Sequence, residues 1–158
     1  MPEPDRQDYL VRLNLNSAAD GWMAAMGIRI ISATSDEVVA EVEVGPAHLQ
    51  AYGIVHGGVY AGLIETIASI GAALEAVPRG MSAVGLENHT SFLRAVRSGK
   101  LHAIAKPLTR GRRTNVWEGS ITDDAGKLVA SGRVRLLLLD PDAQIAGERV
   151  AVKPAGGD

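Results

Sequence analysis

The fold is decided by the run GGVYAGLIETIASIGAALEAVP, residues 57–78. Its apolar residues fall nearly all round a helix of about 3.6 residues per turn, so the run predicts a helix from about Val59 to Val77 that is buried on several sides. Proline cannot continue a helix and disfavours helix in the residue before it, so Pro78 sets the end. A helix of this reach is about 30 Å long.

Segments with the patterns of β-strands lie on both sides of this helix. Before it, a short helix from about Ser17 to Gly27 precedes a predicted hairpin, and after it four antiparallel strands follow one another. The expected strands are residues 28–33, 38–44, 82–93, 100–108, 114–122 and 127–139. Strands and helices are not interleaved, so the sequence predicts an α+β fold in which a curved antiparallel sheet wraps the long helix.

Length and composition fit one domain. The chain has 158 residues, and we assign residues 1–16 to a flexible leader, residues 17–140 to the domain and residues 141–158 to a flexible tail. A formal net charge of −2 argues against a dedicated nucleic-acid binder, which is usually clearly basic. The absence of cysteine excludes disulfides, thiolate metal sites and a cysteine nucleophile.

Targeting signals and metal motifs are also missing from the sequence. The first residues are polar with no apolar signal core behind them, and Glu65 and Glu75 interrupt the one long apolar run. The histidines at positions 48, 56, 89 and 102 do not have the spacing of metal ligands. We therefore expect a cytoplasmic protein that neither binds a metal nor spans a membrane.

The start of the long helix carries the densest group of candidate functional residues. Gly57 and Gly58 would leave unpaired N–H groups at the positive end of the helix dipole, which suits an oxyanion, although the glycines would equally give steric room at a crossing. His56 fits an acid–base group, a helix cap or a loop histidine. Gln50 carries no meaning in isolation.

Glu65 lies inside the apolar helix, where a carboxylate rarely lacks a partner or a task. The alternative is a side chain that faces water. Ser69 follows one turn later on the same face, within reach of the carboxylate, and it fits a small packing residue equally well. Arg94, Arg112 and Arg113 are solvated surface arginines or, alternatively, ligands for the phosphates of a bound molecule.

Three segments resemble one family. The segment GIVHGGVYAGLIE, residues 53–65, resembles the signature of hotdog-fold acyl-CoA thioesterases of the PaaI type. The segment GMSAVGLENHTSFLR, residues 80–94, is similar to the Arthrobacter-type 4-hydroxybenzoyl-CoA thioesterases. The run from Lys106 to Glu118 is similar to the enterobactin-pathway proofreading thioesterases and the dihydroxynaphthoyl-CoA thioesterases. The resemblance covers roughly residues 26–139.

The resemblance implies a hotdog fold in a homodimer, usually further paired into a homotetramer, with an active site across the dimer interface. Gly57 would donate its N–H to the thioester carbonyl, and Glu65 of the partner subunit would be the nucleophile or the general base. Gln50 and His56 fall on active-site positions of the family, and Ser69 falls on a hydroxyl that supports the carboxylate. The reaction would require no cofactor.

The resemblance also bears on the substrate. Arg94 matches an arginine of the family's coenzyme A site, whereas Arg112 and Arg113 replace a Ser-Thr pair, so we expect a rearranged grip on coenzyme A. An aromatic acyl group is expected first, and a medium-chain aliphatic group stays open. The acyl pocket would draw on the first helix and the central helix, through residues Trp22, Met23, Met26, Ile67 and Ile70.

Two other functions stay open at this point. A hotdog protein that binds acyl-CoA without hydrolysing it would not need Glu65. A 3-hydroxyacyl dehydratase would use a histidine and an acidic residue, and His56 and Glu65 are both present, although the Gly57-Gly58 pair fits a thioesterase better.

Overall fold

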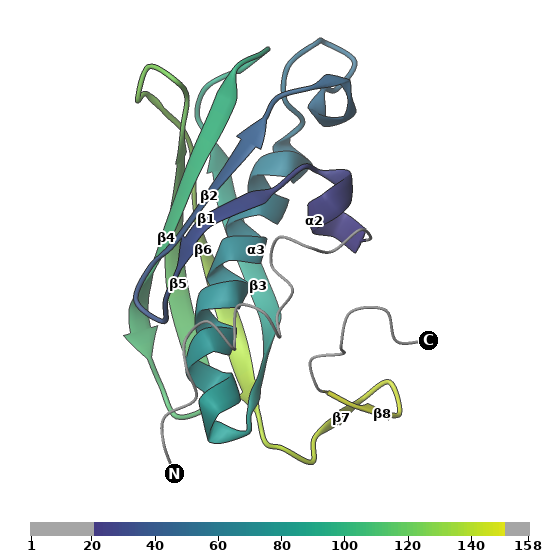
Figure 1. Cartoon of the computed structure of the whole chain (residues 1–158), viewed down its shortest axis with the longest axis vertical. Helices are drawn as coiled ribbons and strands as arrows, with labels where there is room; N and C mark the ends of the chain where they lie inside the picture. Colours follow the sequence, from purple (N-terminus) through teal and green to yellow (C-terminus); the bar gives the residue numbers. More distant parts are fainter. Residues whose placement is uncertain (1–20, 151–158) are drawn as a thin grey trace.

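The computed structural model describes residues 21–150 of the chain. One long helix, α3 (Gly57–Ala76), packs against a curved antiparallel sheet of six strands (Figure 1). The strands are β1 (Arg29–Ala33), β2 (Val38–Glu43), β3 (Ser82–Phe92), β4 (Lys100–Arg110), β5 (Thr114–Thr122) and β6 (Leu128–Leu139). The predicted α+β fold, with a sheet wrapped around a long helix, is confirmed.

The sheet order is β1-β2-β4-β5-β6-β3, and all five neighbouring pairs are antiparallel. The expectation that the last four strands follow one another therefore needs a correction, because β3 pairs with β6 rather than with β4. Pairing β4 with β2 instead joins the N-terminal hairpin to the rest of the sheet. The result is a single sheet whose two edges are β1 and β3.

Strand β2 buries alternate residues, as its sequence pattern predicted. On β2, Val38, Ala40 and Val42 are buried, while Glu43 is exposed and Glu41 forms an ion pair of 3.5 Å with Lys100. Burying an aliphatic side chain of this size stabilises the fold by about 1.5–3 kcal/mol. The strands' inward side chains therefore anchor the sheet on α3.

Helix α3 is buried on several sides, also as predicted. It begins two residues before the expected start and ends at Ala76, where Pro78 lies in a single 3-10 turn, Val77–Arg79. By length and composition Gly57–Arg79 could cross a membrane, but half of its most apolar window is buried inside the molecule. That burial is what the core helix of a folded domain shows.

Short elements flank this domain. Helix α2 (Gly21–Ala25) falls within the helix expected from Ser17, whose beginning lies outside the described residues, as does the leader of residues 1–16. A small hairpin, β7 (Gln144–Ile145) with β8 (Glu148–Arg149), follows the sheet in a region where the sequence predicted no pattern. The extent assigned to the domain and to the tail beyond residue 140 stays a prediction.

Helix α3 approaches the sheet closely at Gly71. A Cβ atom added to Gly71 would collide with the indole of Trp117 on β5, reaching Cζ2 at 2.7 Å. Trp117 is fully buried. Nearer the middle of the helix, Gly119 of β5 makes the same kind of contact with Ile64, 2.8 Å from its Cγ2. Both glycines let a large side chain fill the space between helix and sheet.

We expect Gly71→Ala to destabilise the protein by about 1–3 kcal/mol, because the added methyl overpacks a filled core. In an ordinary helix interior the same change would stabilise by about 1 kcal/mol. Denaturant unfolding measures the effect. The double variant Gly71→Ala/Trp117→Leu should lose less than the sum of the two single variants, and strict additivity would show that the contact with Trp117 is not the cause.

Candidate active site

The N-terminus of α3 presents one free backbone donor. His56 caps the helix, because its Nδ1 accepts a hydrogen bond of 2.8 Å from the N–H of Gly58. Its carbonyl accepts from the N–H of Val59 at 2.9 Å. Within residues 21–150, nothing accepts a hydrogen bond from the N–H of Gly57. A free N–H at the positive end of a long helix is a suitable donor for an oxyanion.

Of the three interpretations of His56, the structure shows the helix cap, through the hydrogen bond from the Gly58 N–H to Nδ1. Because Nδ1 accepts from a backbone N–H, the neutral ring carries its proton on Nε2. The cap is present in the structure, and a catalytic role for His56 stays a prediction.

Phe92, at the end of β3, packs directly on Gly57. A Cβ atom on Gly57 would collide with this ring, at 2.9 Å from Cδ2, 2.7 Å from Cζ and closer still to Cε2. The Phe92 ring is 6.0 Å from the ring of Tyr60 and remains 58% exposed. Sequence reasoning had not selected Phe92, the only phenylalanine of the chain, as a site residue.

A cavity of about 270 Å³ lies beside the start of α3. It brings together three of the predicted site residues, Gln50, Gly57 and Arg94. The other lining residues are Ile54, Val55, Tyr60, Phe92, Leu93 and Ala95. Burial raises the pKa of the Tyr60 phenol, so this side chain stays neutral at physiological pH.

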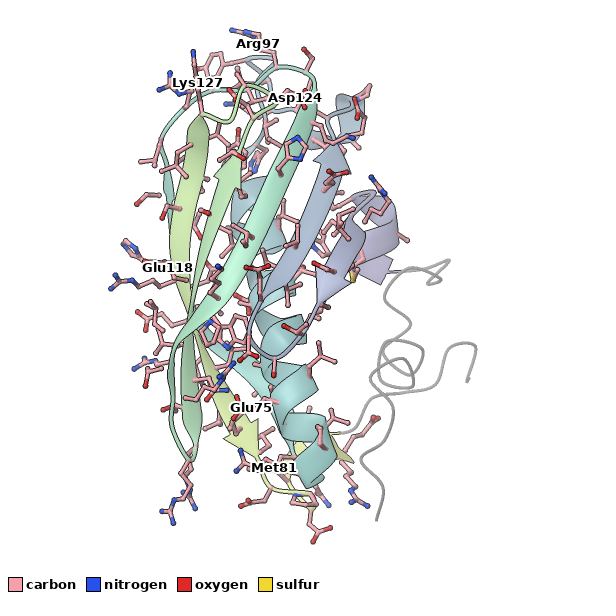
Figure 2. All side chains as sticks on the ribbon, turned by 60° about the vertical axis from the view of Figure 1, so that its left-hand side comes forward. Glu75, Met81, Arg97, Glu118, Asp124 and Lys127 are labelled. Atoms are coloured by element: carbon pink, nitrogen blue, oxygen red, sulfur yellow. The ribbon has the colours of Figure 1, made fainter. Side chains whose placement is uncertain are left out.

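The loop that carries Gln50 is held in place by hydrogen bonds. Gln50 Oε1 accepts from the N–H of Tyr52 at 3.0 Å, which leaves the amide NH₂ group as the donor of this side chain. Arg97 Nη1 donates to the carbonyls of Tyr52 and Gly53 at 2.9 and 3.1 Å. Figure 2 shows Arg97 at one end of the molecule and Glu75 toward the other.

Glu65 lies at a second cavity, of about 410 Å³, between α3 and β3. The cavity is lined by Ala61, Gly62, Glu65, Asn88, Thr90 and Phe92. Glu65 is partly buried, and its Oε2 accepts a hydrogen bond of 2.9 Å from Asn88 Nδ2. The carboxylate therefore has the partner that its place in an apolar helix led us to expect, and that partner comes from β3.

Ser69 lies one turn beyond Glu65 on α3 and is partly buried. The hydrogen bond that the structure gives the carboxylate comes from Asn88 and not from the Ser69 hydroxyl. Support of Glu65 by Ser69 thus stays a prediction.

Gly57 and Glu65 of one chain lie apart. They are eight residues apart on one helix, so they are separated by about 12 Å along its axis. Phe92 lines both cavities and stands between them. An oxyanion donor and a nucleophile must both come within about 3 Å of one carbonyl group, so a single chain does not join these two residues on one substrate.

The predicted coenzyme A ligands are also separated within one chain. Arg94 lines the cavity at the start of α3. Arg112 and Arg113 are exposed in the β4–β5 turn, and Arg110 just before this turn lies 3.4 Å from Glu75, near the end of α3. Gly57 and Glu75 are about 27 Å apart along the helix.

Of the residues predicted for the acyl pocket, Trp22 lies beside the cavity of Glu65 and Ile67 and Ile70 do not. The indole of Trp22 on α2 packs on Gly62, where an added Cβ would lie 3.1 Å from Cε2, and Gly62 lines the cavity of Glu65. Met23 and Met26 are partly buried against the core. Ile67 and Ile70 belong to the buried core and line neither of the two cavities described above.

In the described part of the chain, no group of three or more His, Asp or Glu residues could hold a metal ion.

Comparisons with known proteins identify the family of this site. Residues 52–130, half of the chain, match the model of the Thioesterase superfamily. The Mycobacterium tuberculosis protein Rv1847 is 43% identical over 117 residues, which are 73% of this chain and 84% of that protein. The 1,4-dihydroxy-2-naphthoyl-CoA hydrolase of Escherichia coli is 32% identical over 126 residues, covering 79% of this chain and 92% of the enzyme.

Solved structures agree with the sequence matches. The structure of Rv1847 superposes with a TM-score of 0.73 at 41% identity and covers 78% of this chain and 98% of its own. The thioesterase HI1161 of Haemophilus influenzae gives a TM-score of 0.75 at 33% identity, covering 87% of this chain and 93% of its own. With its helix wrapped by a curved antiparallel sheet, the chain has the hotdog fold and belongs to the thioesterase superfamily.

Proposed function

We propose that this protein hydrolyses an acyl-CoA thioester, with an aromatic acyl group, at a site shared by two copies of the chain. The observation that carries the proposal is the pair of groups on α3: a free N–H at its start and a carboxylate, Glu65, at a cavity in its middle. As a member of the thioesterase superfamily the protein is a thioester hydrolase. The relative from Escherichia coli named as a 1,4-dihydroxy-2-naphthoyl-CoA hydrolase supports an acyl-CoA as the substrate.

The N–H of Gly57 would bind the thioester oxygen. As the carbonyl carbon is attacked, negative charge grows on that oxygen, and the helix dipole favours the charge. One such donor lowers the barrier by about 2.7–4 kcal/mol in other acyl-transfer enzymes. The Gln50 amide lines the same cavity as Gly57 and offers a second N–H donor.

Glu65 would supply the attacking group in one of two ways. Its carboxylate attacks the carbonyl carbon, expels the coenzyme A thiolate and leaves an anhydride that water then hydrolyses. Alternatively it takes a proton from a water molecule that attacks the same carbon. Both routes end in a free acid and the coenzyme A thiol, and both require the ionised carboxylate.

In a dimer, the Gly57 N–H of one copy and the Glu65 carboxylate of the other could meet at one thioester, although the two groups of a single chain lie too far apart. A two-fold axis near Ala61, halfway between Gly57 and Glu65, places Gly57 of one copy opposite Glu65 of the other. Strand β3 is an edge strand of 11 residues whose free backbone groups can pair with a second copy of itself. Its side chains Leu86 and Phe92 are 51% and 58% exposed, and such a contact would cover them.

Coenzyme A would be held by arginines of more than one copy. Arg94 shares the cavity of Gly57 and is placed to meet the phosphates of a thioester bound there. Arg112 and Arg113 lie toward the other end of α3 in the same chain, so they can reach that coenzyme A only from another copy. An assembly of two dimers into a tetramer is consistent with this need.

We expect Glu65→Gln to lower the release of coenzyme A thiol by about 10²–10⁴-fold, the usual contribution of a positioned base. The matched control is Glu75→Gln on the same helix, which should keep its turnover. A panel of aromatic and aliphatic acyl-CoAs is assayed with a thiol reagent. Wild-type protein that binds acyl-CoA without releasing thiol would indicate a binding protein, and loss of water from a 3-hydroxyacyl-CoA would indicate a dehydratase.

Mixed dimers test the shared site. Gly57→Pro removes the proposed donor and also places a Cβ against the Phe92 ring, so it disables the Gly57 end of the site in its own chain; the ψ of 135° at His56 suits a residue before proline. Equal amounts of Gly57→Pro and Glu65→Gln, each inactive alone, should regain about a quarter of wild-type activity after exchange, because half of the dimers are mixed and each has one intact site. No recovery in dimers that mass spectrometry shows to be mixed would place both residues in one chain.

The aromatic preference rests on Trp22. We expect Trp22→Ala to lower kcat/KM for benzoyl-CoA about 2- to 10-fold more than for octanoyl-CoA, since an aromatic pair contributes about 0.5–1.5 kcal/mol beyond its buried area. Ile145→Ala, an exposed apolar residue on β7, is the control and should change neither value. Equal losses for the two substrates would argue against an aromatic acyl group beside Trp22.

A further inference from the structure

We propose that Asn88 is a positioning residue that fixes the carboxylate of Glu65 in its reactive orientation. The inference rests on the proposed function, because it assigns a task to a residue next to the proposed nucleophile or base. Asn88 lies on β3, lines the cavity of Glu65 and comes from a different element than the carboxylate it holds.

Every polar atom of the Asn88 side chain is engaged. Its Nδ2 donates to the carbonyl of Ala61 at 3.0 Å and to Glu65 Oε2 at 2.9 Å. Its Oδ1 accepts from Thr90 Oγ1 at 2.6 Å. A carbonyl and an ionised carboxylate only accept hydrogen bonds, so the nitrogen has to face α3 and the oxygen has to face Thr90. The amide is therefore locked in one orientation.

The strand is shaped for this contact at Gly85. The pairing of β3 with β6 shifts between Gly85 and Glu87, so Leu86 is an extra residue at a β-bulge. A Cβ atom on Gly85 would collide with Glu65 Oε1 and would lie 3.4 Å from Cδ. One carboxylate oxygen thus lies against the backbone of Gly85, while the other accepts the amide of Asn88.

The chemical nature of the partner matters for reactivity. A neutral amide holds a carboxylate in place without cancelling its charge, whereas an arginine stabilises the charge and makes the carboxylate a weaker base and nucleophile. Among the ion pairs of residues 21–150, none includes Glu65. Asn88 gives Glu65 orientation and leaves it able to react.

The chain contains a matched control for this test. Asn115 Nδ2 donates to Glu75 Oε2 at 2.9 Å, the same amide–carboxylate bond on the same helix, and Asn115 is fully buried. Replacing either asparagine by leucine keeps the size of the side chain and removes the donor. Asn88 is exposed and Asn115 is fully buried, so if Asn88 served stability alone, Asn88→Leu would cost less stability than Asn115→Leu and would leave kcat unchanged.

We expect Asn88→Leu to lower kcat for acyl-CoA hydrolysis by about 10- to 100-fold, with KM changed less than about twofold, because a small misplacement of a reacting group costs up to this much. Asn115→Leu should lower the unfolding temperature and keep the kcat of the folded protein. Thr90→Val removes the O–H donor to Asn88 and should lower kcat in the same direction but less, and Thr90→Ser should restore it.

Crystal structures of the wild type and of Asn88→Leu give a readout that does not depend on activity. The Glu65 carboxylate should turn away from its wild-type position in the variant. If the wild type hydrolyses no acyl-CoA, the proposed function fails and these structures alone decide the positioning. The inference is overturned by an unchanged carboxylate position, by a wild-type kcat in Asn88→Leu, or by a loss of activity that only follows a loss of stability, as in Asn115→Leu.

If Asn88→Leu does not fold, Thr90→Val and Thr90→Ser decide the inference by the same comparison of kcat.

Discussion

Helix α3 lies so close to the sheet that Gly71 has no room for a side chain beside Trp117, and Gly119 has none beside Ile64. These contacts bring the helix into the hollow of the sheet, where most of its circumference is covered. Burial of aliphatic side chains drives this packing, and the two glycines allow the helix to approach the sheet closely. The candidate site residues Gly57 and Glu65 lie on the strip of α3 that the sheet leaves uncovered.

That strip faces the edge strand β3. Ala61 and Gly62 precede Glu65 by four and three residues, so each shares a face of the helix with it, and all three line the same cavity. The sheet's edge at β3 ends in Phe92, which reaches the start of the helix at Gly57. The free helix N-terminus, the carboxylate and the unpaired strand edge therefore all lie along the part of the domain that its own core leaves open.

The main elements could be predicted from the sequence because they depend on local periodicity. The long apolar run, its end near Pro78 and the alternation on β2 each report a local environment, and Glu65 attracted notice as a charge in an apolar helix. The order of the strands could not be predicted, since pairing β2 with β4 joins segments that are separated by more than 50 residues. Composition and spacing do not record such a contact.

The missed residues of the candidate site share a physical reason. Asn88 and Gly85 contact α3 only once β3 has packed beside it, and β3 has no buried residue, so no alternation along this strand marks Asn88. Asn88 is exposed in the chain, so its burial offered no signal either. Arg94 lies just beyond β3 beside the start of α3, whereas Arg112 belongs to a turn near the opposite end of that helix, and the sequence does not show this separation.

The two carboxylates of α3 show how environment divides residues of one type. Glu75 lies 3.5 Å from Arg79 and 3.4 Å from Arg110, and it also accepts from Asn115, so its charge is compensated and its side chain ties helix to sheet. Glu65, ten residues earlier, receives an amide from Asn88. Glu75 is tied into the fold by two arginines and an amide, whereas the one hydrogen-bond partner that the described residues give the Glu65 side chain is a neutral amide. The two glutamates of this helix therefore differ in their partners: Glu75 joins the helix to the sheet through ion pairs, and Glu65 is the glutamate that the proposed reaction uses.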